Sequence, residues 1–210
     1  MSFPIDFKQQ LVAAYDADAD RRSIRKDRHG WKAEVRDLFI DRLKREGKKS
    51  ILEVGAGAGV DAQFFSSKGF DVLATDLSPK MVDACRAAGL TSAILDVYDI
   101  NSLGRRFDAV FSMNVLLHIP PEDLGQILAN IASVLEKGGL FFYGVYGGTT
   151  KEEITTDPTR MNLPRYFSFL NDEALLNFIG HQYEIVDFKS IGIKDEQAGL
   201  HFQFLLLRKI

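Results

Sequence analysis

The most informative residues form a glycine-rich turn between acidic side chains. Residues 51–59 read ILEVGAGAG, so an apolar run leads directly into a Gly-x-Gly-x-Gly turn and then into a predicted helix. Glycine lets the backbone turn sharply and approach a ligand without a Cβ in the way. Asp76 ends the next predicted strand, where a carboxylate accepts hydrogen bonds from the ribose hydroxyls of a nucleoside. A plainer interpretation of Asp76 is a charge partner at the start of the following helix.

The turn departs from the dinucleotide-binding fingerprint in two places. Val60 stands where Gly-x-Gly-x-x-Gly needs its third glycine, and Glu53 lies two residues before the first glycine. A carboxylate beside the turn repels a pyrophosphate but suits a ligand with a cationic amine or a sulfonium. The residues therefore favour an adenosyl cofactor that carries an amino acid over NAD.

Short apolar runs alternate with helical stretches, and this alternation predicts how the chemistry is positioned. Strands separated by helices imply right-handed crossovers and a parallel sheet covered on both faces. Residues 194–200 are too few for a crossover helix, so the last two strands are expected to be antiparallel. We predict an α/β, Rossmann-like, doubly wound sheet of seven strands, mostly parallel, whose ligands bind beyond the carboxyl ends. The predicted strands are 50–54, 70–75, 92–95, 107–113, 140–146, 183–193 and 201–208.

Helices are predicted around and between these strands. One is expected to end near residues 137–139, where Lys-Gly-Gly forms a good stop signal, and another follows Asn171 or Asp172. Residues 1–48 are interpreted as a helical N-terminal extension that forms a lid for cofactor or substrate. Residues 49–210 form the main domain, with a lid insert at about 147–170. The other predicted helices cover 3–20, 28–46, a stretch to about 68, and 78–88.

Composition excludes several classes of protein. The 210 residues are 46% hydrophobic and 26% charged, as in an ordinary globular domain, and no apolar run is long enough to span a membrane. The one cysteine, Cys85, excludes an intramolecular disulfide framework and a multi-thiolate metal site. Residues 1–50 carry a net charge of +4 within an overall −3, so the acidic remainder argues against nucleic-acid binding. We expect a cytoplasmic protein, monomeric or homodimeric, with no metal site.

Several stretches resemble class I S-adenosylmethionine-dependent methyltransferases of the small-molecule kind. The matching stretches are ILEVGAGAGVDAQFF, VLATDLSPKMVDACR, AILDVYDI, FDAVFSMNVLLHIPPEDL and LHFQFLLLRK, so the resemblance runs from about Lys49 to Ile210. It implies S-adenosylmethionine as cofactor and S-adenosylhomocysteine as product. It also implies a cofactor site built from Glu53, Gly55, Ala56, Gly57, Gly59, Asp76, Leu77, Met81, Asp96, Val97, Met113 and Asn114, with Tyr15 and Trp31 closing over it. Asp96 also fits a turn-forming aspartate.

Methyl transfer from a sulfonium is a direct displacement, so alignment supplies much of the catalysis and a base is needed only for a protonated acceptor. His118 follows the fourth strand, and His201 begins the reversed strand at the cofactor edge. Either histidine fits a base, although helix-entry packing explains His118 and a backbone hydrogen bond explains His201. The substrate pocket is expected to include Tyr146, Arg160, Arg165 and Tyr166, which favours an aromatic or acidic small molecule.

The predicted function is methyl transfer to an oxygen or nitrogen of a small molecule. The fourth strand ends in Ser-Met-Asn-Val rather than the Asn/Asp-Pro-Pro-Tyr/Phe of amino-methylating DNA enzymes. One alternative remains open, a non-catalytic S-adenosylmethionine-binding or interaction module. RNA methylation is a weaker alternative, because no appended RNA-binding module is recognisable.

Overall fold

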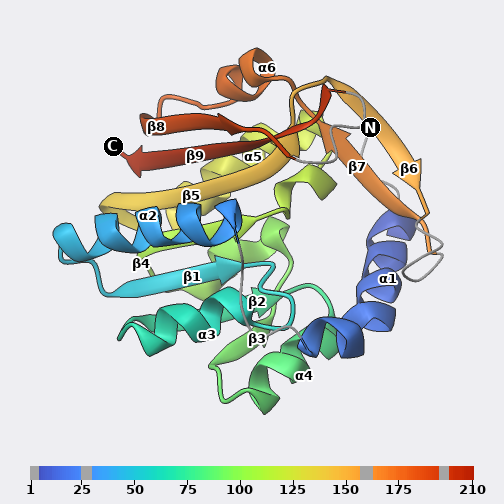
Figure 1. Cartoon of the computed structure of the whole chain (residues 1–210), viewed down its shortest axis with the longest axis horizontal. Helices are drawn as coiled ribbons and strands as arrows, with labels where there is room; N and C mark the ends of the chain where they lie inside the picture. The colour runs from blue at the N-terminus through green and yellow to red at the C-terminus, as the bar shows by residue number, and fades with distance from the viewer. Residues whose placement is uncertain (1–4, 25–29, 157–162, 194–198) are drawn as a thin grey trace.

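A seven-stranded sheet forms the centre of the molecule (Figure 1). The computed structural model describes residues 5–24, 30–156, 163–193 and 199–210. The strand order is β3-β2-β1-β4-β5-β9-β8, which confirms the expected Rossmann-like α/β fold. The strands are β1 (Ser50–Val54), β2 (Asp71–Asp76), β3 (Ser92–Ile94), β4 (Phe107–Met113), β5 (Leu135–Gly147), β8 (Tyr183–Ile191) and β9 (His201–Lys209).

Strand direction follows the lengths of the connections. The pairs β1–β2, β1–β4, β2–β3 and β4–β5 are parallel, while β9 runs antiparallel to both β5 and β8. The register places His201 opposite Gly147, so β9 begins at the edge of the sheet where β5 ends. The antiparallel closing pair was expected from the short connection before it, and the structure confirms it.

Helices cover both faces of the sheet, and the side chains of the strands alternate between the two layers. One layer contains α2 (Trp31–Arg45) and α3 (Val60–Ser67), which pack on the face that carries Ile51. The opposite layer contains α5 (Pro121–Ser133) and α6 (Asp172–Asn177), which pack on the face that carries Leu52. Helix α4 (Pro79–Ala87) and the short 3₁₀ helices η1 (Val97–Leu103) and η2 (Leu116–His118) complete the connections.

An aromatic cluster fixes α2 to the sheet. Phe39 of α2 is fully buried, and its ring lies 5.6 Å from that of Phe111 in β4 and 5.5 Å from that of Phe142 in β5. Burying an aromatic side chain of this size stabilises a fold by about 1.5–3 kcal/mol. Helix α2 therefore belongs to the core layer, although its sequence lies within the predicted N-terminal extension.

The predicted end of α5 near residues 137–139 is wrong. The helix ends at Ser133, and β5 begins at Leu135, so Gly138 and Gly139 lie within the strand. A Cβ at Gly139 would lie 2.8 Å from the Glu136 carbonyl oxygen, so the glycine permits close passage of the backbone. The register between β4 and β5 shifts here, and a local glycine pattern does not distinguish such an irregularity from a helix stop.

The insert after β5 contains regular structure that the sequence analysis missed. Strands β6 (Lys151–Thr155) and β7 (Arg165–Phe169) pair as a separate antiparallel sheet. Helix α1 (Ile5–Ser23) contacts both β7 and α4, and Figure 1 shows it across the carboxyl edge of the main sheet. No helix in the described part of the chain is long and apolar enough to cross a membrane.

Candidate functional site

A cavity of about 660 Å³ lies at the carboxyl ends of β1, β2 and β4. This volume falls within the usual range for small-molecule sites, roughly 300–1,000 Å³. The glycine turn forms one side of the cavity. Helix α1 forms another wall through Phe7, Lys8, Leu11, Val12 and Tyr15. The rest of the wall comes from η2, β7 and the ends of β3 and β5.

The three glycines of the turn are required for different steric reasons. Gly55, Gly57 and Gly59 all have positive φ angles, which non-glycine residues rarely adopt. A Cβ at Gly55 would lie 2.2 Å from Val115 Cγ2, and one at Gly59 would lie 2.5 Å from Leu90 Cδ1. Nothing in the described chain lies within 4 Å of a Cβ placed at Gly57, which lines the cavity. Gly55 and Gly59 therefore permit the packing of the turn, while Gly57 leaves its backbone open to a ligand.

Asp76 joins the turn to the start of α4. Its Oδ2 accepts a hydrogen bond from Gly57 N at 2.8 Å, and its Oδ1 accepts one from Ser78 N at 2.9 Å. Burial raises the pKa of the carboxyl, and these two backbone donors oppose that shift. Asp76 thus serves the start of α4, as the plainer interpretation held, and it also lines the cavity.

Asp96 occupies the equivalent place after β3. Its Oδ1 accepts from Tyr98 N at 3.0 Å, as a turn-forming aspartate does, and its Oδ2 accepts from Lys8 Nζ at 2.6 Å. The ion pair with Lys8 connects α1 to the main domain across the cavity. Asp96 and the following Val97 both line the cavity.

Asn114 is a strained residue at the end of β4. It has a φ of 60°, and it is the one non-glycine residue with positive φ in the described part of the chain. Its side-chain Oδ1 is buried and has no hydrogen-bond partner among the described residues, while its backbone N–H donates to Gly144 O at 2.7 Å. Backbone strain and buried polar atoms without hydrogen bonds are concentrated at active sites and ligand-binding sites. Asn114 lines the cavity beside Met113.

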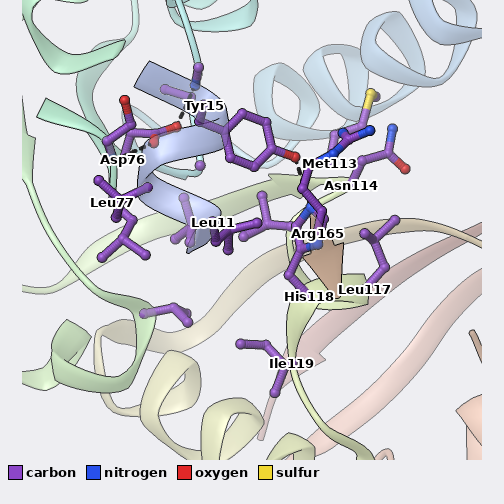
Figure 2. Close-up of a pocket in the computed structure, with 18 of the residues that line it drawn as sticks. Leu11, Tyr15, Asp76, Leu77, Met113, Asn114, Leu117, His118, Ile119 and Arg165 are labelled. Carbon is purple, nitrogen blue, oxygen red and sulfur yellow. Dashed lines mark hydrogen bonds between the residues drawn. The ribbon is translucent and has the colours of Figure 1, made fainter. Parts of the chain in front are cut away.

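His118 and Tyr15 form a buried hydrogen-bonded pair (Figure 2). His118 is 8% exposed, and its Nδ1 lies 2.7 Å from the Tyr166 carbonyl oxygen. A carbonyl oxygen only accepts, so Nδ1 carries the proton and Nε2 accepts from the Tyr15 hydroxyl at 2.8 Å. Burial lowers the pKa of His118 to about 4, so the ring is neutral at neutral pH. Burial likewise raises the pKa of Tyr15.

Arg165 reaches the same part of the cavity from β7. The side chain is 7% exposed and lies beside Tyr15 and His118 (Figure 2). The positive charge of Arg165 lowers the pKa of both Tyr15 and His118. Burial is the larger cause in each case: it raises the pKa of Tyr15 and lowers that of His118. Tyr166 and Phe167 extend the wall, and the Phe167 ring lies 4.8 Å from the His118 ring.

Several predicted cofactor residues do not line the cavity. Glu53 is 3% exposed and lies under the turn, and Gly59 lies behind it. Met81 is fully buried and packs with Ala19 of α1. Trp31 packs on Phe202 with a centroid distance of 4.4 Å. None of these four residues is among those that line the cavity, and their cofactor roles stay predictions.

His201 also lies outside the cavity lining. Its Nε2 is 2.7 Å from Asp172 Oδ1, and the same carboxylate accepts from Gln203 at 2.7 Å and from Ser190 at 2.8 Å. This network connects β9 and β8 to the start of α6. The histidine is held by a carboxylate rather than by the backbone, and its role as a base stays a prediction.

The remaining predictions divide between the cavity and the undescribed segments. Arg160 lies outside the described residues. The apolar row of α1 at Phe7 and Leu11 was missed, although its spacing of four residues up to Tyr15 is a helical signal. No group of three or more His, Cys, Asp or Glu suited to a metal ion occurs in the described ranges. The predicted residues that line the cavity are Tyr15, Gly55, Ala56, Gly57, Asp76, Leu77, Asp96, Val97, Met113, Asn114, His118, Tyr146, Arg165 and Tyr166.

Comparison with known sequences shows that part of this chain is similar to methyltransferases. A family model described as a methyltransferase domain matches residues 51–139. The chain is 30% identical over 142 residues to a ubiquinone biosynthesis O-methyltransferase of Xanthomonas oryzae, with 64% of this chain and 56% of that protein covered. A protein with the same name from Xanthomonas axonopodis is 32% identical over the same shares of each chain. The chain therefore spans a little over half the length of these curated relatives.

Solved structures share the fold at low identity. Magnesium protoporphyrin IX methyltransferase from Synechocystis, with bound S-adenosylhomocysteine, gives a TM-score of 0.71 at 15% identity, covering 97% of this chain and 100% of that one. 1,6-Didemethyltoxoflavin-N1-methyltransferase from Burkholderia thailandensis gives 0.68 at 22% identity, covering 100% and 91%. The [4+2]-cyclase SpnF gives 0.70 at 18% identity, covering 96% of each chain. Together, the matched domain and the curated relatives show that this chain is similar to methyltransferases, and the sheet order shows that it shares the Rossmann-like fold of these solved structures.

Proposed function

We propose that this protein transfers a methyl group from S-adenosylmethionine to an oxygen or nitrogen of a small molecule. One observation carries the proposal. A single cavity joins the Gly57 turn and two carboxylates, Asp76 and Asp96, to a neutral histidine with a basic nitrogen, His118. The Gly57 turn and the two carboxylates suit an adenosyl ligand, and His118 suits an acceptor that must lose a proton.

The residues present fit the cofactor. Asp76 and Asp96 carry the acceptor oxygens that ribose hydroxyls and an adenine amino group require, and both line the cavity. The unpartnered Oδ1 of Asn114 offers a further acceptor for the cationic amine. Gly57 leaves room for close approach of the ligand to the backbone. When bound, S-adenosylmethionine supplies an electrophilic methyl group on a sulfonium that leaves as a neutral thioether.

The chain's own residues align the acceptor and receive its proton. The acceptor lone pair forms a bond to the methyl carbon while the carbon–sulfur bond breaks toward sulfur, so alignment accounts for much of the rate. A hydroxyl or N–H acceptor must also lose a proton. The Nε2 of His118 is the base in this proposal, and the Tyr15 hydroxyl that now donates to it relays the proton. The hydrogen bond from His118 Nδ1 to the Tyr166 carbonyl oxygen fixes the tautomer in which Nε2 is unprotonated.

Helix α1 acts as the lid in this proposal. It crosses the cavity and is tied to the main domain by Lys8 on Asp96, by Tyr15 on His118, and by Asp16 on Ser78. All three contacts are polar and reach residues at the cavity, so ligand entry requires them to open. The β6–β7 sheet, which lies within the predicted insert, completes the lid on the side opposite α4.

Calorimetric titration with S-adenosylmethionine, S-adenosylhomocysteine and NAD tests the cofactor assignment. We expect micromolar binding of both adenosyl ligands and no binding of NAD. Asp83→Ala is the control variant, because this exposed carboxylate of α4 pairs with Arg86 away from the cavity. A folded protein that binds no adenosyl ligand would contradict the proposal.

Turnover is tested separately by the formation of S-adenosylhomocysteine in the presence of small phenols, acids and amines. Product formation with any of them supports the catalytic function. Tight cofactor binding without product from any acceptor favours the non-catalytic binding module.

A further inference from the structure

Arg165 is a buried cation for which the described chain provides no counter-ion. Its side chain is 7% exposed and lines the cavity. None of the ion pairs formed among the described residues includes Arg165, and its Nε has no hydrogen-bond acceptor there. A buried charge without a partner is costly, so such a group is retained where a ligand compensates it.

Most of the other cations that line the cavity differ from Arg165 in this respect, and the exception, Lys32, is less buried and lies over the Trp31 and Tyr146 rings. Lys8 pairs with Asp96 at 2.6 Å, and Arg22 pairs with Asp18 at 2.5 Å. Arg165 instead has the Tyr15 hydroxyl and the Phe167 ring as neighbours, with its Cζ 5.1 Å from the ring centroid. Neither group is an anion, because burial raises the pKa of Tyr15 and keeps its hydroxyl protonated.

The surroundings of Arg165 also define the body of the ligand. Phe167 lines the cavity, and its ring stacks on that of Phe169, which does not line it, at a centroid distance of 5.8 Å and an interplanar angle of 5°. Leu117 continues the apolar wall beside His118, and Ile119 lies below it (Figure 2). A flat or apolar body therefore fits beside the guanidinium, whose planar fork can hold a carboxylate through two parallel hydrogen bonds.

We propose that the methyl acceptor is an organic acid with an aromatic or apolar body, and that Arg165 holds its carboxylate. The inference rests on the proposed methyl transfer, since it names the substrate class of the same cavity. Arg165 lies beside Tyr15 and His118, so an acid held there lies next to the proposed proton relay. With a neutral acceptor, the guanidinium would have no counter-ion from the described part of the chain.

The test compares acids with their uncharged amides. The probes are benzoate, 4-hydroxybenzoate, phenylacetate and indole-3-acetate, each paired with its carboxamide, titrated into protein saturated with S-adenosylhomocysteine. At least one acid should bind about tenfold or more tightly than its amide, because a charge-assisted hydrogen bond is lost in the amide. Arg165→Gln should abolish that preference, and Arg165→Lys should retain part of it.

Controls separate this inference from the proposed function. Affinity for S-adenosylhomocysteine should be unchanged in both Arg165 variants, which also shows that they fold. Arg86→Gln removes an exposed arginine of α4 that pairs with Asp83, and it should leave the acid preference intact. Equal binding of acids and amides, no binding of any acid, or a preference that survives Arg165→Gln overturns the inference. Failure of S-adenosylhomocysteine to bind the unaltered protein overturns the proposed function instead.

Discussion

His118 makes the stability of the fold depend on pH. The buried ring donates through Nδ1 to the Tyr166 carbonyl oxygen and accepts through Nε2 from the Tyr15 hydroxyl. The hydrogen bond that Nε2 accepts requires the neutral ring, because a protonated ring would carry a second donor toward a group that already donates. The bond from Nδ1 to the Tyr166 carbonyl favours the charged ring, but burial outweighs it and lowers the pKa from 6.5 to about 4.

The magnitude follows from the two pKa values. Between pH 6.5 and about pH 4, the unfolded chain binds a proton at His118 that the folded chain does not. Stability therefore falls as the pH is lowered through this window, and it is fully present above pH 6.5. At about 1.4 kcal/mol for each pH unit, the loss attributable to His118 is about 3 kcal/mol.

Urea unfolding of the unaltered protein and of His118→Gln between pH 7 and pH 4 measures this effect. Glutamine can donate to the Tyr166 carbonyl and accept from Tyr15, but it does not titrate. The stability advantage of histidine over glutamine should shrink by about 3 kcal/mol across the range. His181→Gln replaces an exposed histidine and should show no comparable trend. A His118→Gln difference that does not change with pH refutes the buried neutral ring and, with it, the proposed base.

Three further predictions test the site and its supports. Asp76→Ala should weaken S-adenosylmethionine binding about tenfold or more in calorimetry, because hydrogen bonds to the charged oxygens are lost and the turn loosens; unchanged affinity would remove Asp76 from the site. His201→Ala should lower the free energy of unfolding by about 1 kcal/mol through the lost bond to Asp172; slower turnover in this variant would support the predicted base role of His201, and unchanged turnover would exclude it. Cys85 is buried and its pKa is raised to about 12, so it should react with an aromatic disulfide at pH 8 only after unfolding; rapid reaction of the folded protein would contradict its burial.

The parts of the fold that the sequence predicted correctly depend on local patterns. The apolar run of β1, the glycine turn and the start of α3 are contiguous, so their order and their place at the sheet edge follow from hydrophobic periodicity and glycine chemistry. Ser78 and Pro79 mark the start of α4 equally well, and the Ser78 hydroxyl accepts from Met81 N at 3.2 Å as a cap should. The short final connection predicted the antiparallel closing strands for a simple reason of chain length.

The parts that the sequence did not predict depend on contacts between distant segments. Gly138 and Gly139 have the pattern of a helix stop, but pairing with β4 places them inside a strand. The β6–β7 sheet has no tight turn in the sequence to announce it, because nine residues separate its two strands. Trp31 was expected over the cofactor, and only the packed structure shows that it contacts Phe202 instead.

Side chains that extend over the sheet edge, rather than the sheet itself, distinguish activities that share this fold. A [4+2]-cyclase has the same architecture as two methyltransferases at similar TM-scores, so the sheet alone does not define the reaction. In this chain, Tyr15 comes from α1, His118 from η2 and Arg165 from β7, three segments outside the main sheet. Each of them contributes to one hydrogen-bonded and charged group at the cavity. Substituting these three side chains should therefore change which acceptor is methylated and how fast it is methylated. Cofactor binding at the glycine turn should stay intact.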